Sequence, residues 1–205
     1  MVVLFTKPID PMKLVFTTHN QHKFSEVKSL LPAHIELVSL TDIGCYDEIP
    51  ETATTIEGNA LLKAKFVWEH YQLACFADDT GLEVLSLNNE PGVYSARYAG
   101  SQNSAQANMK KLLDNLKGKT DRTAQFKTTI ALVGADFEEL FDGICVGEIV
   151  ETHRGEGGFG YDPIFQPIGF SEIFAQMTLQ QKNEIGHRGK AIRKLIAHLQ
   201  NKYLF

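Results

Sequence analysis

Residues 73–87, LACFADDTGLEVLSL, constrain the fold of this chain more than any other stretch. An apolar run leads directly into two adjacent carboxylates, Asp78 and Asp79. A short apolar run bounded by turn residues predicts a buried strand. Thr80 and Gly81 then predict a turn, after which a second apolar segment follows. The two acids are therefore expected at the end of a rigid element, where a site can be held in place.

Adjacent carboxylates repel each other, so their charge must be compensated. Mg²⁺ is a usual partner, because it prefers one or two carboxylates together with substrate phosphates. The alternative is a plain hairpin turn, in which Asp and Gly are common. The tripeptide D-T-G that begins at Asp79 also occurs in aspartic proteases, which need two such aspartates sharing a proton. This chain has one copy, so a homodimer would have to supply the second, and the sequence favours the metal interpretation.

The composition is that of an ordinary globular protein, with 43% hydrophobic and 22% charged residues. A net charge of −5 argues against a nucleic-acid-binding face, which would be basic. A local cluster of Lys and Arg can still bind a small anionic ligand. We expect one domain over residues 12–205, preceded by an N-terminal extension over residues 1–11. That extension is too short and too interrupted for a signal peptide or a membrane span.

The three cysteines, Cys45, Cys75 and Cys145, are widely spaced and odd in number. They show neither a disulfide framework nor the spacing of a zinc site. This pattern is typical of a protein in a reducing compartment, and it predicts a cytoplasmic location.

The order strand, turn, helix opens the predicted domain. Residues 13–17 predict a short strand, and residues 21–31 predict a helix capped by Asn20 and ended by Pro32. Lys23 falls in the first turn of this helix, and a helix N-terminus that follows a strand is a ready anion site. The alternative is an ordinary capped helix with a solvated lysine.

The rest of the chain alternates between strand and helix patterns. Thr54 and Glu57 predict a capping box for a helix over Ile56–Tyr71, and Thr178 and Gln181 predict a second one. Further elements are predicted as helices over 104–116 and 188–202 and as strands over 123–133, 137–141 and 144–150. The pattern indicates a mixed α/β sheet with flanking helices.

A glycine-rich stretch over residues 155–165, GEGGFGYDPIF, matches G-x-G-x-x-G. The dinucleotide-binding fingerprint must open a helix within a βαβ unit, and here prolines and a non-helical pattern follow. A protein kinase would need a far longer chain after its glycine-rich loop. The stretch instead presents Phe159, Tyr161 and Asp162 on a flexible backbone. The two rings would either stack on a flat base or fill the core.

These separate patterns resemble the inosine triphosphate pyrophosphatase family, the house-cleaning hydrolases for XTP, ITP and dITP. The resemblance runs from about Lys13 to the C-terminus. It rests on motifs that occur in the right order, namely THNQHK at 18–23, EGNALLKA at 57–64 with ADDTG at 77–81, PGVYSARYAG at 91–100, and GGFGYDPIF at 157–165 with KNEIGHRGKA at 182–191.

The resemblance implies a role for each matching residue. Glu51 and Asp79 would bind Mg²⁺, and Asp79 would be the catalytic base. Thr80 stands where the family usually has Ser, as does Gly186. The remaining substrate contacts would come from the phosphate-binding turn, the base-binding loop and the C-terminal motif, namely Thr18, His19, Asn20, Gln21, His22, Lys23, Thr80, Phe159, Gly160, Tyr161, Asp162, Lys182, His187 and Arg188.

The family fold implied is an elongated mixed α/β sheet with two lobes around a central cleft, and members are usually homodimers. The expected activity is Mg²⁺-dependent cleavage of a purine nucleoside triphosphate into the monophosphate and pyrophosphate. No nucleic acid or membrane partner is expected. The alternative is a catalytically silent sensor that keeps the nucleotide pocket without turnover.

Overall fold

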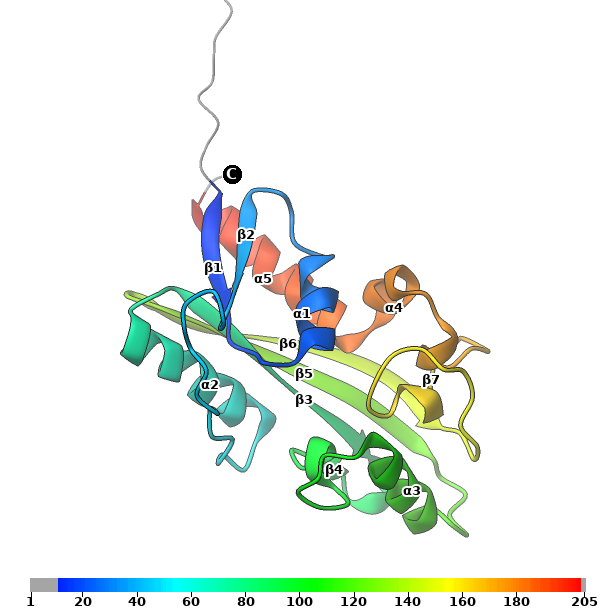
Figure 1. Cartoon of the computed structure of the whole chain (residues 1–205). Helices are drawn as coiled ribbons and strands as arrows, with labels where there is room; N and C mark the ends of the chain where they lie inside the picture. The colour runs from blue at the N-terminus through cyan, green and yellow to red at the C-terminus, as the bar shows by residue number, and fades with distance from the viewer. Residues whose placement is uncertain (1–10, 204–205) are drawn as a thin grey trace, which may run out of the picture.

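A computed structural model describes residues 11–203 and contains one mixed β-sheet with helices on both faces (Figure 1). Most of the predicted N-terminal extension lies outside the described residues. The strands are β1 Met12–Phe16, β2 Ile35–Ser39, β3 Cys75–Val84, β4 Glu90–Gly92, β5 Thr123–Gly134, β6 Phe137–Ile149 and β7 Phe165–Pro167. The α-helices are α1 Gln21–Lys28, α2 Ile56–Tyr71, α3 Ala105–Asn115, α4 Leu179–Ile185 and α5 His187–Tyr203.

The strand order is β2-β1-β3-β5-β6-β7, and β4 pairs with the far end of β3. β1 is parallel to β2 and to β3, whereas β3, β5, β6 and β7 pair antiparallel. The predicted mixed α/β sheet is therefore confirmed. None of the described helices combines the length and the apolar character that crossing a bilayer requires.

Side-chain alternation along the strands places the core on both faces of the sheet. Leu14 of β1 and Phe76 of β3 belong to an apolar cluster with α1 and α5. Val15 and Ala77, one position further along each strand, belong to a second cluster with α2. Successive residues of a strand point to opposite faces, so α2 covers one face and α1 and α5 cover the other (Figure 1).

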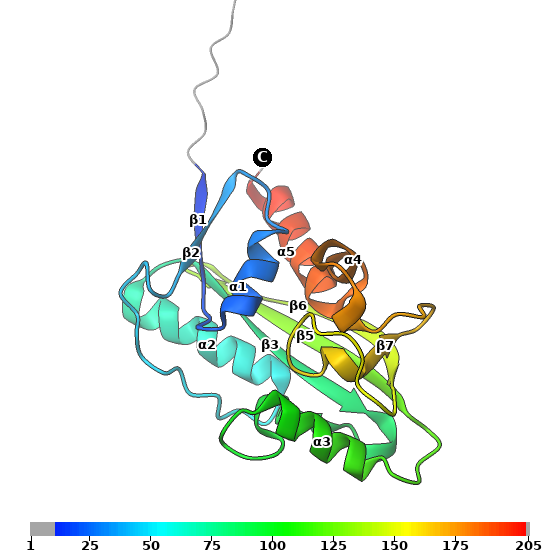
Figure 2. The same ribbon diagram turned by 45° about the vertical axis from the view of Figure 1, so that its right-hand side comes forward.

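A third apolar cluster occupies the opposite end of the sheet. It joins the last residues of β3 to α3 and to the segments around β7, with Leu82, Leu112 and Phe165 at its centre. Figure 2 shows α3 far from α5 along the long strands. The apolar core is thus divided between two ends of one sheet, which correspond to the two predicted lobes.

The predicted turn at Thr80 and Gly81 is wrong, because β3 continues through both residues to Val84. β5 pairs with β3 over the whole range from Cys75 to Val84, and this pairing keeps the chain extended. Gly81 serves close packing rather than turning: a Cβ atom there would lie 2.6 Å from the carbonyl oxygen of Gly92. The two acids therefore lie in the middle of a strand.

The predicted break at Asp142 and Gly143 is also wrong, since β6 runs unbroken from Phe137 to Ile149 against β5. At Gly143, as at Gly81, another segment of backbone lies very close to the strand. A Cβ atom on it would lie 2.0 Å from the carbonyl oxygen of His187, so only glycine lets the start of α5 reach the sheet.

Helix positions agree with the sequence pattern, while some boundaries differ. The helix over Ile56–Tyr71 is confirmed, but Thr55 rather than Thr54 caps it, because the Thr55 side chain accepts the Gly58 N–H at 3.0 Å. The capping box of Thr178 and Gln181 is confirmed. The first helix ends at Lys28, before the predicted end, and the short strand β2 was not predicted.

Candidate active site

The candidate site lies where the edge of β3 has no strand partner on one side. β1 pairs with β3 only as far as Phe76, and β4 pairs with it only from Leu82 onward. Residues 77–81 lie between these registers and pair with β5 alone. The opening follows the carboxyl end of β1, the position where open α/β sheets bind ligands. Side chains from both faces of the sheet can reach a ligand there.

The turn after β1 has the geometry of a capped helix start. The Asn20 side chain accepts the N–H groups of His22 at 3.0 Å and Lys23 at 3.1 Å. The Thr18 hydroxyl accepts the Asn20 N–H at 3.1 Å. His19 bonds the Asp47 carbonyl oxygen at 3.0 Å through Nε2. The turn is therefore preorganised, and its helix N-terminus faces the opening with exposed side chains, including that of Gln21.

Asp78 lies on the α1 and α5 face, where two cations bind it. Lys23 Nζ donates to Asp78 Oδ1 at 3.0 Å, and Arg188 Nε donates to Oδ2 at 2.9 Å. Burial acts to raise the pKa of Asp78, but the charges of Lys23, Arg188 and Lys63 outweigh it and hold the pKa well below the ordinary value. Burial also lowers the pKa of Lys23. Asp78 is thus a fully ionised anchor for the cations.

A second pair of contacts extends this network toward the glycine-rich loop. Arg188 also binds Glu26 of α1, and Lys182 of α4 donates to Glu26 Oε1 at 2.8 Å. Lys182 Nζ donates to Asp162 Oδ2 at 2.6 Å. Burial raises the pKa of Asp162, with Lys182 partly offsetting this effect. The network therefore joins α1, α4, α5 and the loop around one buried set of charges.

Asp79 lies on the opposite face, toward α2. Lys63 Nζ donates to Asp79 Oδ1 at 3.0 Å and to Glu51 Oε1 at 2.6 Å, so one ammonium joins both predicted metal ligands. Arg97 also lies 3.6 Å from Glu51. Burial raises the pKa of Asp79, and the nearby Glu51 carboxylate adds to this shift, which Lys63 only partly offsets. Asp79 is therefore a carboxylate whose charge is incompletely compensated.

This pair of carboxylates fits Mg²⁺ by its donor chemistry. The described residues contain no group of three or more His, Cys, Asp or Glu side chains arranged for a metal ion. Mg²⁺ does not need one, because it is commonly bound by one or two carboxylates with substrate phosphates and waters. The raised pKa of Asp79 marks the place where added positive charge would be most favourable.

Hydroxyl groups of neighbouring strands connect Arg188 to His187 on the α5 face of the sheet. Thr80 Oγ1 lies 2.7 Å from Thr128 Oγ1, and Thr128 Oγ1 lies 2.6 Å from His187 Nδ1. Arg188 donates to Thr80 Oγ1 at 3.1 Å. Burial and the charges of neighbouring cations hold the pKa of His187 well below its ordinary value, so the imidazole is neutral at pH 7. The ring of His187 stacks on Phe126 with centroids 4.7 Å apart.

The two rings predicted to bind the base, Phe159 and Tyr161, lie in different surroundings. Phe159 is partly buried, and its ring stacks on His22 with centroids 5.4 Å apart. Tyr161 instead belongs to the apolar core and donates its hydroxyl to the Ser95 carbonyl oxygen at 2.9 Å. Gly160 adopts φ +64°, which favours glycine. Phe159 is therefore the ring that the loop presents to the site.

Several residues of the site were not predicted from the sequence. Lys63 could have been found, because this lysine shares the α2 face of Ile56, Ala60 and Val67, where a buried cation needs a partner. Glu26 carried no such signal.

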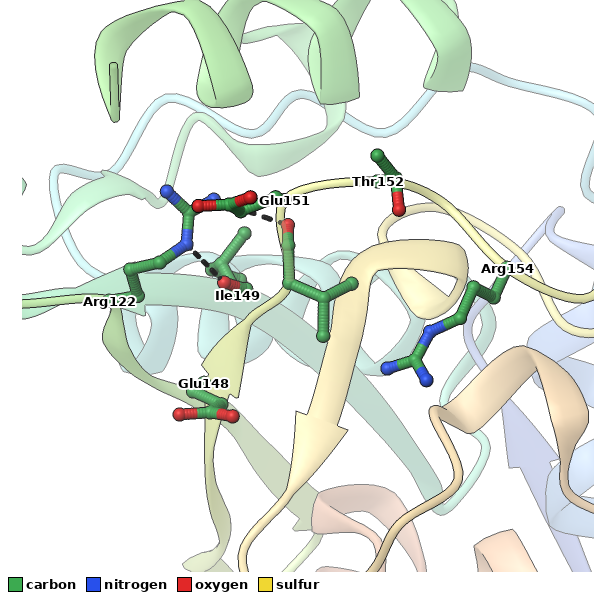
Figure 3. Close-up of a pocket in the computed structure, with 7 residues that line it drawn as sticks. Arg122, Glu148, Ile149, Glu151, Thr152 and Arg154 are labelled. Carbon is green, nitrogen blue, oxygen red and sulfur yellow. Dashed lines mark hydrogen bonds between the residues drawn. The ribbon is translucent and has the colours of Figure 1, made fainter. Parts of the chain in front are cut away.

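Away from the candidate site, a cavity of about 410 Å³ is lined by Arg122, Glu148, Ile149, Val150, Glu151, Thr152 and Arg154 (Figure 3). Arg122 donates to the carbonyl oxygens of Ile149 and Val150, and Arg154 donates to Gln166. None of the lining residues belongs to the charged network, and both guanidinium groups already have protein partners. The cavity therefore does not extend the candidate site.

The fold is a mixed α/β sheet, and buried lysine, arginine and carboxylate side chains meet at a gap beside its central strand. An α/β protein with such a site is suited to a polyanionic ligand. The model of the Ham1 family matches residues 14–198 of this chain. The chain belongs to the Ham1 family.

Similar proteins support this assignment over nearly the whole chain. The dITP/XTP pyrophosphatase of Christiangramia forsetii is 58% identical and is covered over 99% of its length by 92% of this chain. That of Flavobacterium johnsoniae is 56% identical, with 90% of this chain and 96% of the relative covered. The structure of the Staphylococcus aureus Ham1 protein matches with a TM-score of 0.85 at 40% identity, covering 93% of this chain and 99% of that one.

Proposed function

We propose that this chain is a Mg²⁺-dependent pyrophosphatase that hydrolyses noncanonical purine nucleoside triphosphates such as XTP, ITP and dITP to the monophosphate and pyrophosphate. The observation that carries the proposal is the convergence of Lys23, Lys63 and Arg188 on Asp78 and Asp79 at the opening beside β3. The chain belongs to the Ham1 family, and curated relatives are named dITP/XTP pyrophosphatases.

The triphosphate would bind at the turn before α1. The Thr18 hydroxyl and Lys23 would donate hydrogen bonds to phosphate oxygens, and the positive end of the helix dipole would favour the anion. Lys23 already carries a buried anionic partner, Asp78, so a phosphate group would share this cation. Glu51 and Asp79 would hold the metal, which when bound neutralises phosphate charge.

Asp79 would act as the general base. A water molecule held by its carboxylate would attack a phosphorus atom of the α–β anhydride and form a new P–O bond. The bond from that phosphorus to the bridging oxygen would break, the water proton would pass to Asp79, and the monophosphate and pyrophosphate would separate. Asp79 has two carboxylate oxygens, so one could contact the metal while the other accepts the proton of the water.

The base would bind between the glycine-rich loop and the start of α5. Phe159 offers a ring for stacking, and His187 and Arg188 offer hydrogen-bond donors to the base edge. Stacking tolerates any base, so the choice among bases must come from these donors. Donors that point at a 6-oxo group would meet a 6-amino group donor to donor in adenine.

We further propose that residues 12–205 act as one domain, that the chain forms a homodimer, and that it works in the cytoplasm. Cys45, Cys75 and Cys145 are all buried and unpaired, which is consistent with a reducing compartment.

The deciding experiment is release of pyrophosphate from ITP in the presence and absence of Mg²⁺. We expect turnover with Mg²⁺ and none after removal of the metal. A protein that binds ITP tightly without releasing pyrophosphate would instead be a nucleotide sensor.

A further inference from the structure

The hydroxyl groups of Thr80 and Thr128 form a continuous chain of hydrogen bonds from Arg188 to His187. Each step is short: 3.1 Å from Arg188 to Thr80, 2.7 Å from Thr80 to Thr128, and 2.6 Å from Thr128 to His187 Nδ1. Thr128 is fully buried. Each hydroxyl has one proton and two acceptor positions, so it can donate only one of its bonds and must accept the others.

Arg188 sets that direction. A guanidinium group only donates, so Thr80 Oγ1 must accept its bond. The single proton of Thr80 can then go to Thr128 at 2.7 Å or to Asp78 Oδ2 at 3.4 Å. Hydroxyl bonds to oxygen are ordinarily about 2.5–3.0 Å long, and the second contact is outside that range. Thr80 therefore donates to Thr128.

We propose that Thr128 is a positioning residue that fixes the tautomer of His187, with the proton on Nε2. Thr128 accepts from Thr80, and its own proton goes to His187 Nδ1. Nδ1 is then the acceptor nitrogen of a neutral ring, and Nε2–H becomes a hydrogen-bond donor. The stack of His187 on Phe126 holds the ring in its plane.

The tautomer of His187 determines whether its Nε2 atom favours a 6-oxo or a 6-amino purine. This step rests on the proposed function. An Nε2–H donor matches a 6-oxo purine and opposes the 6-amino group of adenine. The reverse tautomer would present an acceptor at Nε2 and would favour the amino group instead. A buried threonine that contacts no substrate would thus act together with Arg188 on which purine the site accepts.

Nitrogen NMR of the ligand-free protein at neutral pH tests the relay directly, because protonated and unprotonated ring nitrogens have widely different shifts. We expect Nε2 of His187 to carry the proton in the wild-type protein. In Thr128→Val, which removes the hydroxyl and keeps the shape, we expect a mixture of both tautomers. Thr128→Ser keeps the hydroxyl and should keep the single tautomer. A wild-type His187 protonated on Nδ1, or a tautomer unchanged in Thr128→Val, would overturn the proposal.

Thr129→Val is the matched control. Thr129 is equally buried and one position away, but its hydroxyl donates to Asp142 at 2.6 Å on the other face of the sheet. We expect it to leave the His187 tautomer and the ratio of kcat/KM for ITP to that for ATP unchanged. Thr128→Val should lower that ratio by about tenfold or more.

The two proposals fail separately. A chain that does not hydrolyse ITP but keeps His187 protonated on Nε2 contradicts the function and supports the relay. A chain that hydrolyses ITP and keeps both its tautomer and its selectivity in Thr128→Val contradicts the relay alone.

Discussion

Asp78 and Asp79 are neighbours in β3 and serve opposite faces of the sheet. Asp78 binds Lys23 of α1 and Arg188 of α5, whereas Asp79 binds Lys63 of α2. The repulsion expected between adjacent carboxylates is relieved because strand alternation separates their side chains and gives each its own cations. The result is two carboxylates with opposite pKa shifts, lowered for Asp78 and raised for Asp79. The two neighbouring carboxylates therefore differ in how completely their charge is compensated.

Asp79→Asn is expected to abolish turnover while the protein stays folded. The substitution removes both a proposed metal ligand and the proposed base, and the loss should be on the order of a thousandfold or more in kcat. Steady-state pyrophosphate release at saturating Mg²⁺ measures it, with circular dichroism as the check on folding. A variant that keeps more than about a tenth of the wild-type rate would show that Asp79 is not the base.

Lys23→Ala is expected to raise KM for triphosphates and to make binding less sensitive to salt. A lost charged phosphate contact should cost roughly 1.5–3 kcal/mol. The variant also removes a partner of buried Asp78, so thermal unfolding must be measured alongside. Lys28→Ala is the control, because Lys28 is exposed at the end of the same helix. Equal KM values for the two variants would show that Lys23 does not contact the phosphates and has a structural role only.

Asp78→Asn is expected to destabilise the fold in a pH-dependent way. Removal of one partner of a buried ion pair costs roughly 3–5 kcal/mol. Because the folded pKa of Asp78 lies below the ordinary 3.8, its contribution is present above that pH and is lost as the pH falls toward the folded value.

Urea unfolding of the wild type and Asp78→Asn should therefore give the largest difference near pH 7 and a shrinking one below about pH 4. Asp136→Asn, an exposed acid at the turn between β5 and β6, provides the baseline. A difference that stays constant down to pH 2 would contradict the assignment of an ionised anchor.

Glu51→Gln is expected to raise the Mg²⁺ concentration needed for half-maximal rate by about tenfold or more, since weakened metal sites commonly lose this much affinity. Glu57→Gln is the matched control, because Glu57 lies nearby on α2 but binds Lys127 instead. A Mg²⁺ titration of both variants decides the matter, and identical curves would exclude Glu51 as a ligand.

ITP and XTP are expected to be hydrolysed with far higher kcat/KM than ATP. A site that hydrogen-bonds one edge of a base can reject its mismatch by on the order of 10⁴. GTP shares the 6-oxo group, so we expect weaker selection against it. Measurement of kcat/KM for all four nucleotides tests this. If kcat/KM for ATP were within about tenfold of that for ITP, selection by hydrogen bonds to the base edge would be wrong, even if the pyrophosphatase activity were confirmed.

Local patterns predicted much of the fold. Caps at Asn20 and Thr178 and the apolar periodicity of residues 56–71 located the helices, because those signals depend on near neighbours in the chain. The turn predicted at Gly81 was wrong. Glycine is needed there because the backbone of Gly92 lies too close for a side chain, and the chain does not change direction.

The site was only partly predictable for the same reason. Motif residues such as Lys23, Asp79 and Arg188 were named from the sequence. Glu26, by contrast, meets Arg188 across 162 positions of the chain, and no local pattern encodes that contact. Thr128 looked like one of many alternating strand residues until the β5 register placed it opposite Thr80.

The unbroken pairing of β3 with β5 limits how this molecule can move. Ten consecutive residue pairs, from Cys75↔Val133 to Val84↔Ala124, carry the sheet through the site and into both lobes. A sheet paired in this way resists bending between its two ends, so we expect the ends to keep their separation when a ligand enters. Any adjustment is then expected in segments attached at the sides of the sheet, such as the loop around Phe159. Gly158 and Gly160 of this loop have positive φ angles, which favour glycine.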